Sequence, residues 1–327
     1  MSRTPIDPVE GIAKYMLKSS QEIIDAAKAL SLSGKRPRIS VASAQDADVL
    51  GAVRSCYDDG ICDASLFGDK GKINGLADRS AISLDGLDII HEPDEEQAIY
   101  RAVALASSGD ADVIMKGFVS TSALLKGVLD KQFNLRAAPT LSHVAVLTLP
   151  RYPKLLMITD GGMVVKPTIQ QRFDILKNAV LVGKALGIMP VRIALSAAAD
   201  SVFASMPQTE EDVLLVKMAR NEKIEGCEVA GPMSFDIATS AEIAAREGIQ
   251  NPVAGNADVY LVGSIEECNI TTKSLIIFAG AVFAGVIVGA RVPISVVSRT
   301  DPVIGKKTSI ALACLVADYY RRMGMRG

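Results

Sequence analysis

The sequence predicts an α/β protein with mostly parallel sheets. Short runs of β-forming residues alternate with longer segments of helical period along nearly the whole chain. Several of the short runs are almost continuously apolar, which is typical of strands covered by helices on both faces. The 327 residues, 49% of them hydrophobic and 22% charged, provide enough apolar side chains for about two domains.

Ten short segments are predicted to be strands because they are apolar and rich in β-branched residues. They are ISVAS at 39–43, LDIIHEP at 87–93, DVIMKG at 112–117, VAVLTLP at 144–150, KLLMITD at 154–160, VRIALSA at 191–197, CEVAGPM at 227–233, VYLVG at 259–263, VIVG at 286–289 and ISVVS at 294–298.

Four longer segments are predicted to be helices. Residues 169–187 and 234–248 have apolar residues near helical spacing and end in glycine, a common C-terminal stop. Another helix is expected to begin at Thr209, with Asp212 in its positively polarised first turn. A last helix is expected over residues 309–320.

One uncharged stretch of 17 residues, at 274–290, is a candidate for a membrane-spanning segment. This length reaches only the lower edge of the roughly 17–25 residues that span a bilayer. Gly280, Gly285 and Gly289 interrupt it as one helix, and the β-branched residues in its second half favour a strand. We therefore expect a buried helix followed by a buried strand.

Charge and composition exclude several classes of protein. Lys and Arg number 35 against 37 Asp and Glu, and Trp is absent, so neither a basic field nor a stacking platform for nucleic acid is present. Two histidines and five cysteines without a CxxC pair offer little for a metal site. The first 16 residues have no apolar run typical of a secretory signal, so we expect a cytosolic protein with free thiols.

Candidate ligand-binding residues follow the predicted strands, because ligands of open α/β sheets collect at the carboxyl ends of strands. Lys116 and the hydroxyls at 120–122 suit an anion, although an ordinary helix cap explains the hydroxyls equally well. Arg299 beside Ser298 suits a phosphate or an acyl phosphate, although an ion pair with Asp301 at a surface turn is the alternative.

Other signals are weaker. The glycine-containing corners at 160–162, 231–232 and 252–258 allow close backbone approach but are also typical of plain turns. The sequence has no GxSxG, GxxxxGK[ST] or HExxH motif, and no GxGxxG follows the first strand. The residues alone therefore indicate a two-domain α/β enzyme that binds a small anionic or phosphorylated ligand.

A series of segments in consistent order resembles the phosphate acetyltransferase and phosphate butyryltransferase family. These segments cover about residues 100–320 and are MKGFVSTSALLKGVLDKQFNLR at 115–136, LSHVAV at 141–146, ITDGGM at 158–163, GPMSFDIATS at 231–240, NPVAGNADVYLV at 251–262, CNITTKSLIIFAGAVFAGVIVGARVPI at 268–294 and SRTD at 298–301. Lys116 with Gly117, and the Leu-Ser-His-Val run at 141–144, are similar to the butyryl branch.

The resemblance implies the reversible reaction acyl-CoA + phosphate ⇌ acyl phosphate + CoA. It also implies two α/β domains like those of isocitrate and isopropylmalate dehydrogenases, with an active-site cleft between them. Residues 1–139 with 296–327 would form the first domain and residues 140–295 the second. The family is at least dimeric, so we expect a homodimer or a higher homo-oligomer.

The resemblance, together with the charge that acyl transfer develops, assigns roles to individual residues. Ser298, Arg299 and Asp301 are the expected catalytic residues. The expected phosphate- or acyl-phosphate-binding residues are Thr121, Ser122, Lys273, Ser298 and Arg299. The expected CoA-binding or cleft-lining residues are Lys116, Ser142, His143, Asp236, Asn256, Asp258 and Asn269.

The sequence departs from the acetyl branch at two positions. Gly305 stands where that branch has an aspartate, seven residues after the motif serine, so the base for the CoA thiol is open among Asp301, Asp236 and Asp258. His143 stands where the acetyl enzymes tend to have arginine, which removes a fixed charge and indicates a different acyl pocket.

Three alternatives remain beside direct acyl transfer. A covalent route would acylate Cys227 or Cys268, although neither has an obvious histidine partner in the sequence. An NAD-dependent decarboxylating dehydrogenase would need clustered aspartates and a nicotinamide loop, and we find neither. A catalytically silent acyl-CoA-binding or scaffold relative is the third. The chemistry requires no cofactor or metal other than CoA as a substrate.

Overall fold

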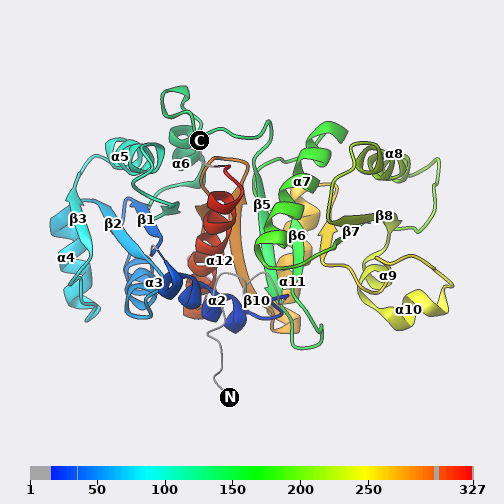
Figure 1. The fold of residues 1–327 in the computed structure, drawn as a ribbon, viewed down its shortest axis with the longest axis horizontal. Helices are drawn as coiled ribbons and strands as arrows, with labels where there is room; N and C mark the ends of the chain where they lie inside the picture. Colours follow the sequence, from blue (N-terminus) through cyan, green and yellow to red (C-terminus); the bar gives the residue numbers. More distant parts are fainter. Residues whose placement is uncertain (1–15, 35, 298–301, 326–327) are drawn as a thin grey trace, which may run out of the picture. The chain divides into compact units, whose positions relative to one another are not determined.

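The computed structural model describes residues 16–34, 36–297 and 302–325, and it contains two compact units (Figure 1). The first unit includes residues 20–137 and the chain from residue 284 onward, and the second includes residues 16–19 and 138–283. The sequence predicted a second domain over residues 140–295, and the main segment of the second unit in the structure covers residues 138–283.

The first unit contains a sheet with the strand order β3-β2-β1-β4-β11-β10. Its strands are β1 (Arg38–Ala42), β2 (Asp63–Gly68), β3 (Asp88–His91), β4 (Val113–Lys116), β10 (Val282–Val288) and β11 (Ile294–Ser295). Its helices are α2 (Ser20–Ser33), α3 (Ala47–Asp58), α4 (Lys70–Arg79), α5 (Glu95–Ser107), α6 (Thr121–Val128), the short 3₁₀ helix η1 (Lys131–Phe133) and α12 (Val303–Arg322). The pairings of β1 with β2 and β4, of β2 with β3, and of β4 with β11 are parallel.

The second unit contains strands in the order β5-β6-β9-β7-β8. These are β5 (Ser142–Thr148), β6 (Leu156–Thr159), β7 (Val191–Ser196), β8 (Cys227–Met233) and β9 (Val259–Leu261). Its helices are α7 (Ile169–Ala185), α8 (Pro207–Asn221), α9 (Phe235–Thr239), α10 (Ala241–Arg246) and α11 (Ile265–Ala279). β5 runs antiparallel to β6, whereas the pairings of β6 with β9, β9 with β7 and β7 with β8 are parallel.

The predicted α/β class with mostly parallel strands is confirmed. Each of the ten predicted strand segments contains a strand, and the helices expected over 169–187 and 309–320 are α7 and α12. α7 begins with a capping box, in which Thr168 and Gln171 satisfy each other's backbone N–H groups. α12 is buried along most of its length and packs against α2 and α3.

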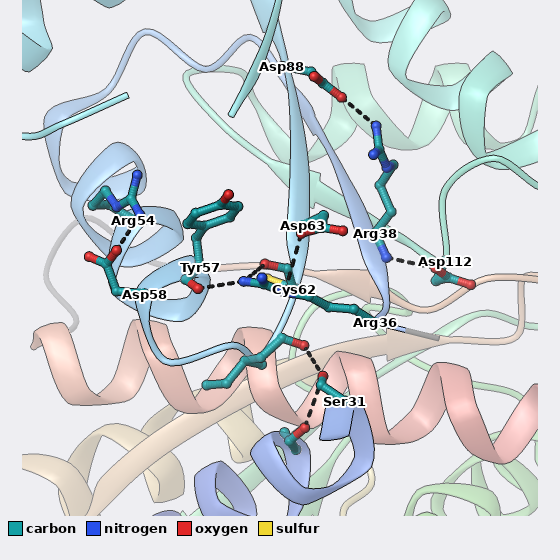
Figure 2. A network of polar contacts seen from close by, with 12 residues as sticks. Ser31, Arg36, Arg38, Arg54, Tyr57, Asp58, Cys62, Asp63, Asp88 and Asp112 are labelled. Carbon is teal, nitrogen blue, oxygen red and sulfur yellow. Dashed lines mark hydrogen bonds and ion pairs between the residues drawn. The ribbon is translucent and has the colours of Figure 1, made fainter. Parts of the chain in front are cut away.

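Charged side chains tie together the amino ends of the parallel strands in the first unit (Figure 2). The Arg36 guanidinium donates to the carbonyl oxygen of Cys62 at 2.8 Å and forms an ion pair with Asp63 at the start of β2. The backbone N–H of Arg38, at the start of β1, donates to Asp112 at 2.7 Å. These contacts pair polar groups at the amino ends of the strands with other groups of the protein. A ligand is therefore expected at the carboxyl ends, where ligands of open α/β sheets bind.

Three predictions on local structure are wrong. α8 begins at Pro207, and Thr209 lies inside it with its hydroxyl donating to the Met206 carbonyl oxygen at 2.7 Å, because proline suits the first helical turn. The helix expected over 234–248 is broken at Ser240, which caps α10 by accepting from the Ile243 N–H. The strand β2 was not expected, because Asp63 and Ser65 interrupt its apolar pattern.

The stretch 274–290 forms the end of α11 and then β10, as predicted, but the helical part is not buried. Ile277 and Phe278 are 71% and 87% exposed. Gly280 ends α11 in the left-handed conformation that glycine adopts without strain. Among the helices of the described residues, none is long and apolar enough to cross a membrane.

Candidate functional site

In the first unit, the carboxyl ends of β1 and β4 approach each other very closely. Gly117, directly after β4, donates its N–H to the Ala42 carbonyl oxygen at 3.0 Å. A Cβ atom on Gly117 would collide with the carbonyl oxygens of Ala42 and Ser43, so only glycine fits there. Ser43 adopts a φ of 60° and is fully buried, and its hydroxyl has no hydrogen-bond partner among the described residues. Residues with a strained backbone conformation are found preferentially at functional sites, and Ser43 combines such a conformation with a buried hydroxyl.

Helix α6 begins at this same edge. Ser120 is its N-cap and accepts from the Ala123 N–H at 3.0 Å, so the cap interpretation holds for Ser120. Thr121 and Ser122 are the first two helical residues, half-buried and exposed respectively. The Lys116 ammonium donates to the Val119 carbonyl oxygen at 3.0 Å. Lys116, Thr121 and Ser122 therefore belong to one corner of the first unit, where the helix dipole favours an anion.

The predicted catalytic residues Ser298, Arg299 and Asp301 lie outside the described residues. In the sequence they follow β11, which is parallel to β4, with Ile294 opposite Ile114. The carboxyl end of β11 therefore lies at the same edge of the sheet as Gly117. Gly305, at the position where an aspartate is expected from the acetyl branch, is buried in the first turn of α12.

In the second unit, His143 and Cys268 both lie close to Gly161, at the carboxyl end of β6. A Cβ atom on Gly161 would lie 2.9 Å from the Cys268 sulfur and 3.2 Å from His143 Nδ1. The His143 ring stacks on Phe283, with ring centroids 6.1 Å apart, and its Nδ1 has no partner among the described residues. Burial lowers the pKa of His143 to about 4 and raises that of Cys268 to about 12, so both groups are neutral at pH 7.

A buried carboxylate organises the loop after β6. Asp160 accepts backbone N–H groups from His143, Gly162, Met163 and Val164 at 2.8–3.2 Å. Burial raises the pKa of Asp160, and this effect is larger than the lowering of the pKa by the four hydrogen bonds. The carboxylate thus fixes the turn that carries Gly161 beside His143.

Asn269 and Lys273 lie one turn apart on α11 and are both exposed, whereas Cys268 and Thr272 are the buried residues of the same helix. α11 begins directly after β9, so its first turns lie at the carboxyl edge of the second unit. Ser142 begins β5 at this edge as well, but it is fully buried and accepts a hydrogen bond from Asn178 at 2.9 Å. The structure therefore makes Ser142 a packing contact between β5 and α7.

Asp258 and Asn256 lie at the other end of β9, at its amino end. The Lys154 ammonium donates to Asp258 at 2.6 Å and to the carbonyl and side-chain oxygens of Asn256 at 2.6 and 2.8 Å. Asp258 also accepts from the Arg192 N–H at 2.8 Å. Within the second unit, these two residues are separated by the length of β9 from Asn269 and Lys273.

Asp236 lies after β8, in the first turn of the short helix α9, and is exposed. It accepts from the Ser234 hydroxyl at 2.5 Å and from the Ile237 N–H, and the Ser234 hydrogen bond is the main reason that its pKa is lowered. Asp236 is therefore a charged carboxylate at the carboxyl edge of the second unit.

Sequence reasoning missed a polar cluster at the start of α11. Glu267 accepts hydrogen bonds from the Ser196 hydroxyl and from the Gly263 N–H, the latter at 2.8 Å, while Ser264 caps the helix. The spacing of Ser264 and Glu267 is that of a capping box, which was the available signal. Gln208 joins the cluster by donating to the Ser196 carbonyl oxygen at 2.7 Å.

The sequence of the chain matches a known enzyme family. The family model described as phosphate acetyl/butaryl transferase matches residues 94–314, which include β4, α6 and α11. The chain belongs to the phosphate acetyl/butyryl transferase family. It is an acyltransferase of this family, as the residues quoted from its sequence indicate.

Similar proteins support the assignment over nearly the whole chain. A phosphate butyryltransferase from Clostridium acetobutylicum is 38% identical over 302 residues, covering 92% of this chain and 99% of that protein. A phosphate acetyltransferase from Thermotoga maritima is 36% identical over 284 residues, covering 87% and 96%. A branched-chain phosphotransacylase from Enterococcus faecalis has a similar crystal structure, with a TM-score of 0.77 and 29% identity, covering 86% of this chain and 99% of that one.

Proposed function

We propose that this member of the family catalyses the reversible transfer of a short acyl group between CoA and inorganic phosphate. The observation that carries the proposal is the match of residues 94–314 to the family, with relatives named for this reaction that cover about nine-tenths of the chain. The two carboxyl-edge corners supply the hydroxyls, cations and helix N-terminus that the chemistry needs.

In the forward direction, a phosphate oxygen attacks the thioester carbonyl carbon. The new C–O bond forms as the C–S bond breaks, and the CoA thiolate leaves and takes up a proton. Arg299 and Lys273 would balance the phosphate charge, Ser298 would hydrogen-bond the developing oxyanion, and Thr121 and Ser122 would bind the remaining phosphate oxygens at the start of α6. Because phosphate is itself the nucleophile, the reaction needs no metal or prosthetic group.

In the reverse direction a carboxylate must accept the CoA thiol proton. Of the three candidates, Asp236 is exposed at the carboxyl edge and carries its charge, whereas Asp258 is buried in an ion pair at the amino edge. Asp301 directly follows the motif Ser298 and Arg299 in the sequence. We therefore favour Asp301 or Asp236 over Asp258 as the base.

Transfer is proposed to be direct, without a covalent acyl-cysteine. Burial raises the pKa of Cys268 to about 12 and also raises that of Cys227, so neither thiol supplies much thiolate at neutral pH. His143 and Cys268 both lie close to Gly161, but the His143 pKa of about 4 makes it a poor proton acceptor. Cys268→Ala should therefore retain turnover, and its complete loss with an intact fold would favour the covalent route.

A short chain such as butyryl is the proposed acyl group. His143 replaces the arginine of the acetyl branch by an imidazole that is neutral at pH 7 and stacks on Phe283, and this removes a cation that would oppose burial of an alkyl chain. Relatives named phosphate butyryltransferase and probable phosphate butyryltransferase, 38% and 40% identical to this chain, support the proposal, although the relative from Thermotoga maritima, at 36% identity, is named phosphate acetyltransferase.

The proposed setting is a homo-oligomer in the cytoplasm. Ile270, Ile277 and Phe278 of α11 are 68%, 71% and 87% exposed, and large apolar side chains gathered on one helix suit contact with another copy. All five cysteines are free, which suits a reducing compartment. The proposed partners are acyl-CoA and phosphate, with no nucleic acid and no membrane.

The test measures thiol release from acetyl-, propionyl-, butyryl- and longer acyl-CoA, with and without phosphate. Release should require phosphate, peak at a short chain and fall at least about 100-fold in Arg299→Ala, because one arginine would carry several charge-assisted contacts. Arg151→Ala, whose side chain is exposed in the connection between β5 and β6, is the matched control. Tight CoA binding without phosphate-dependent release would instead identify a catalytically silent relative.

A further inference from the structure

Three of the five cysteines gather in one place in the first unit. Cys56 lies near the end of α3, Cys62 directly precedes β2, and Cys314 lies within α12. The thiols of Cys56 and Cys314 each donate a hydrogen bond to the Cys62 sulfur, so Cys62 contacts both. The three residues are referred to below as the thiol cluster. The proposed acyl transfer uses none of them.

Backbone contacts bring the thiol cluster together. The end of α3 lies beside the residue before Cys62, because the Ile61 N–H donates to the Cys56 carbonyl oxygen at 2.9 Å. α12 packs against α3, and the Cys56 sulfur lies 4.0 Å from the carbonyl oxygen of Lys307. Lys307 precedes Cys314 by about two turns of α12. The packing of α12 on α3 therefore closes the cluster.

The thiol cluster lies away from the α6 corner of the same unit. Cys62 is at the amino end of β2, and Figure 2 shows it beside Arg36. Thr121 and Ser122 instead follow the carboxyl end of β4, and β1, β2 and β4 run parallel. The cluster and the proposed phosphate-binding residues of this unit thus lie at opposite edges of one sheet.

The surroundings separate the cluster into one thiolate and two thiols. Hydrogen bonds from Cys314 and Cys56, together with the Arg36 guanidinium, outweigh burial and lower the pKa of Cys62 to about 5. The hydrogen bond to Cys62, together with burial, raises the pKa of Cys56 and of Cys314. At pH 7 Cys62 is therefore the nucleophilic sulfur, and each neighbour keeps the proton of a resolving thiol.

Burial limits which oxidant can reach the thiol cluster. All three side chains are fully buried, so a bulky disulfide reagent cannot approach them in the folded protein. Hydrogen peroxide is little larger than water and needs only a local opening. The ion pair of Arg36 and Asp63, which flank Cys62, has side chains 28% and 36% exposed, so the cluster lies close to the surface.

We propose that the thiol cluster is a peroxide-responsive site, in which Cys62 is oxidised and then forms a disulfide with Cys56 or Cys314. The Cys62 thiolate attacks one peroxide oxygen, the O–O bond breaks, and hydroxide leaves, which makes Cys62 a sulfenic acid. The neighbouring thiol then attacks the Cys62 sulfur. The S–S bond forms as the S–O bond breaks, and the hydroxyl leaves as water with the thiol proton. Two thiols are oxidised and one peroxide is reduced to two waters.

The experiment treats the reduced, folded protein with hydrogen peroxide and counts the remaining thiols after denaturation. The wild type should lose two of its five thiols, and peptide mapping should find one intramolecular disulfide that includes Cys62. Cys62→Ala should lose none at the same dose, because both remaining cluster thiols keep their protons. Cys227→Ala is the matched control and should lose two thiols, as the wild type does. Circular dichroism checks that each variant is folded.

The control is informative because Cys227 is more exposed than any residue of the thiol cluster. Exposure alone would make Cys227 react first, whereas burial raises its pKa and keeps it a thiol. Oxidation confined to Cys227 would therefore overturn the proposal. Retention of all five thiols by the folded wild type, or a disulfide that does not include Cys62, would overturn it as well.

A double variant isolates the first step. In Cys56→Ser/Cys314→Ser the two hydroxyls can still donate to the Cys62 sulfur, but no resolving thiol is left. The sulfenic acid should then persist, and dimedone should label Cys62 after peroxide treatment. Labelling at Cys62 supports its role as the attacking sulfur, and a folded double variant without any label at Cys62 contradicts it.

Discussion

Asp258→Asn is expected to unfold the second unit more easily while leaving the chemistry intact. Asp258 is fully buried, lies 2.6 Å from the Lys154 ammonium and accepts the Arg192 N–H at 2.8 Å. The amide keeps the volume but removes the charge, so the Lys154 ammonium loses its counter-ion within a side chain that is only 8% exposed. Breaking one partner of a buried pair typically costs about 3–5 kcal/mol.

For a unit of this size, that loss corresponds to a fall of roughly 10 °C in the thermal midpoint, which circular dichroism measures. At a temperature where both proteins are folded, kcat for thiol release should agree within about twofold, because Asp258 lies at the amino end of β9. A general base would instead contribute about 10²–10⁴-fold.

Two controls make this test decisive. Lys154→Met should destabilise by a similar amount, and the double variant should lose less than the sum of the two single losses, since it removes both charges. A hundredfold loss of kcat at an unchanged midpoint would refute the structural role and restore Asp258 as the base. A midpoint shift below about 2 °C would refute the energy assigned to the ion pair.

Three further outcomes follow from the same structure. Burial lowers the pKa of His143 to about 4, so between pH 6.5 and pH 4 the unfolded chain binds a proton at this residue that the folded protein does not. The free energy of unfolding should therefore fall by up to about 1.4 kcal/mol per pH unit in this window. The thermal midpoint of His143→Gln should fall less than that of the wild type over the same window. Gly161→Ala should destabilise by about 1–3 kcal/mol because its Cβ lies 2.9 Å from the Cys268 sulfur, and Cys268→Ala in the same chain should recover part of the loss in a denaturation series. Ser43→Gly should leave the midpoint unchanged or higher, since it relieves a φ of 60°, but should lower turnover if the buried hydroxyl serves the site; unchanged kinetics would make the residue structural.

Much of the fold could be predicted because the pattern is local. Buried parallel strands need continuous apolar residues, so segments such as 191–197 and 227–233 identified β7 and β8. The strand β2 was not predicted because Asp63 and Ser65 make its sequence look polar. In the structure Asp63 forms an ion pair with Arg36 and Ser65 is buried, and neither contact can be recognised from a local pattern. Thr209 looked like a helix cap for the same reason, since Pro207 two residues earlier begins the helix instead.

Only some of the candidate site residues could likewise be identified from the sequence. Thr121 could be named from the sequence because ligand-binding edges follow strand ends, whereas Asn269 was named only from the resemblance to the family. The buried roles of Ser142 and Asp258 could not, because their partners Asn178 and Lys154 are distant in the chain.

The sequence by itself determined the α/β class, the family and the kinds of side chain available for acyl transfer. These depend on residue type and on order along the chain, which folding does not change. Tertiary structure decided which carboxylate is buried in an ion pair and that His143 and Cys268 both lie close to Gly161. Such properties depend on distance and burial between residues far apart in the sequence, because a charge or a thiol acquires its pKa and its partners only from what packs around it.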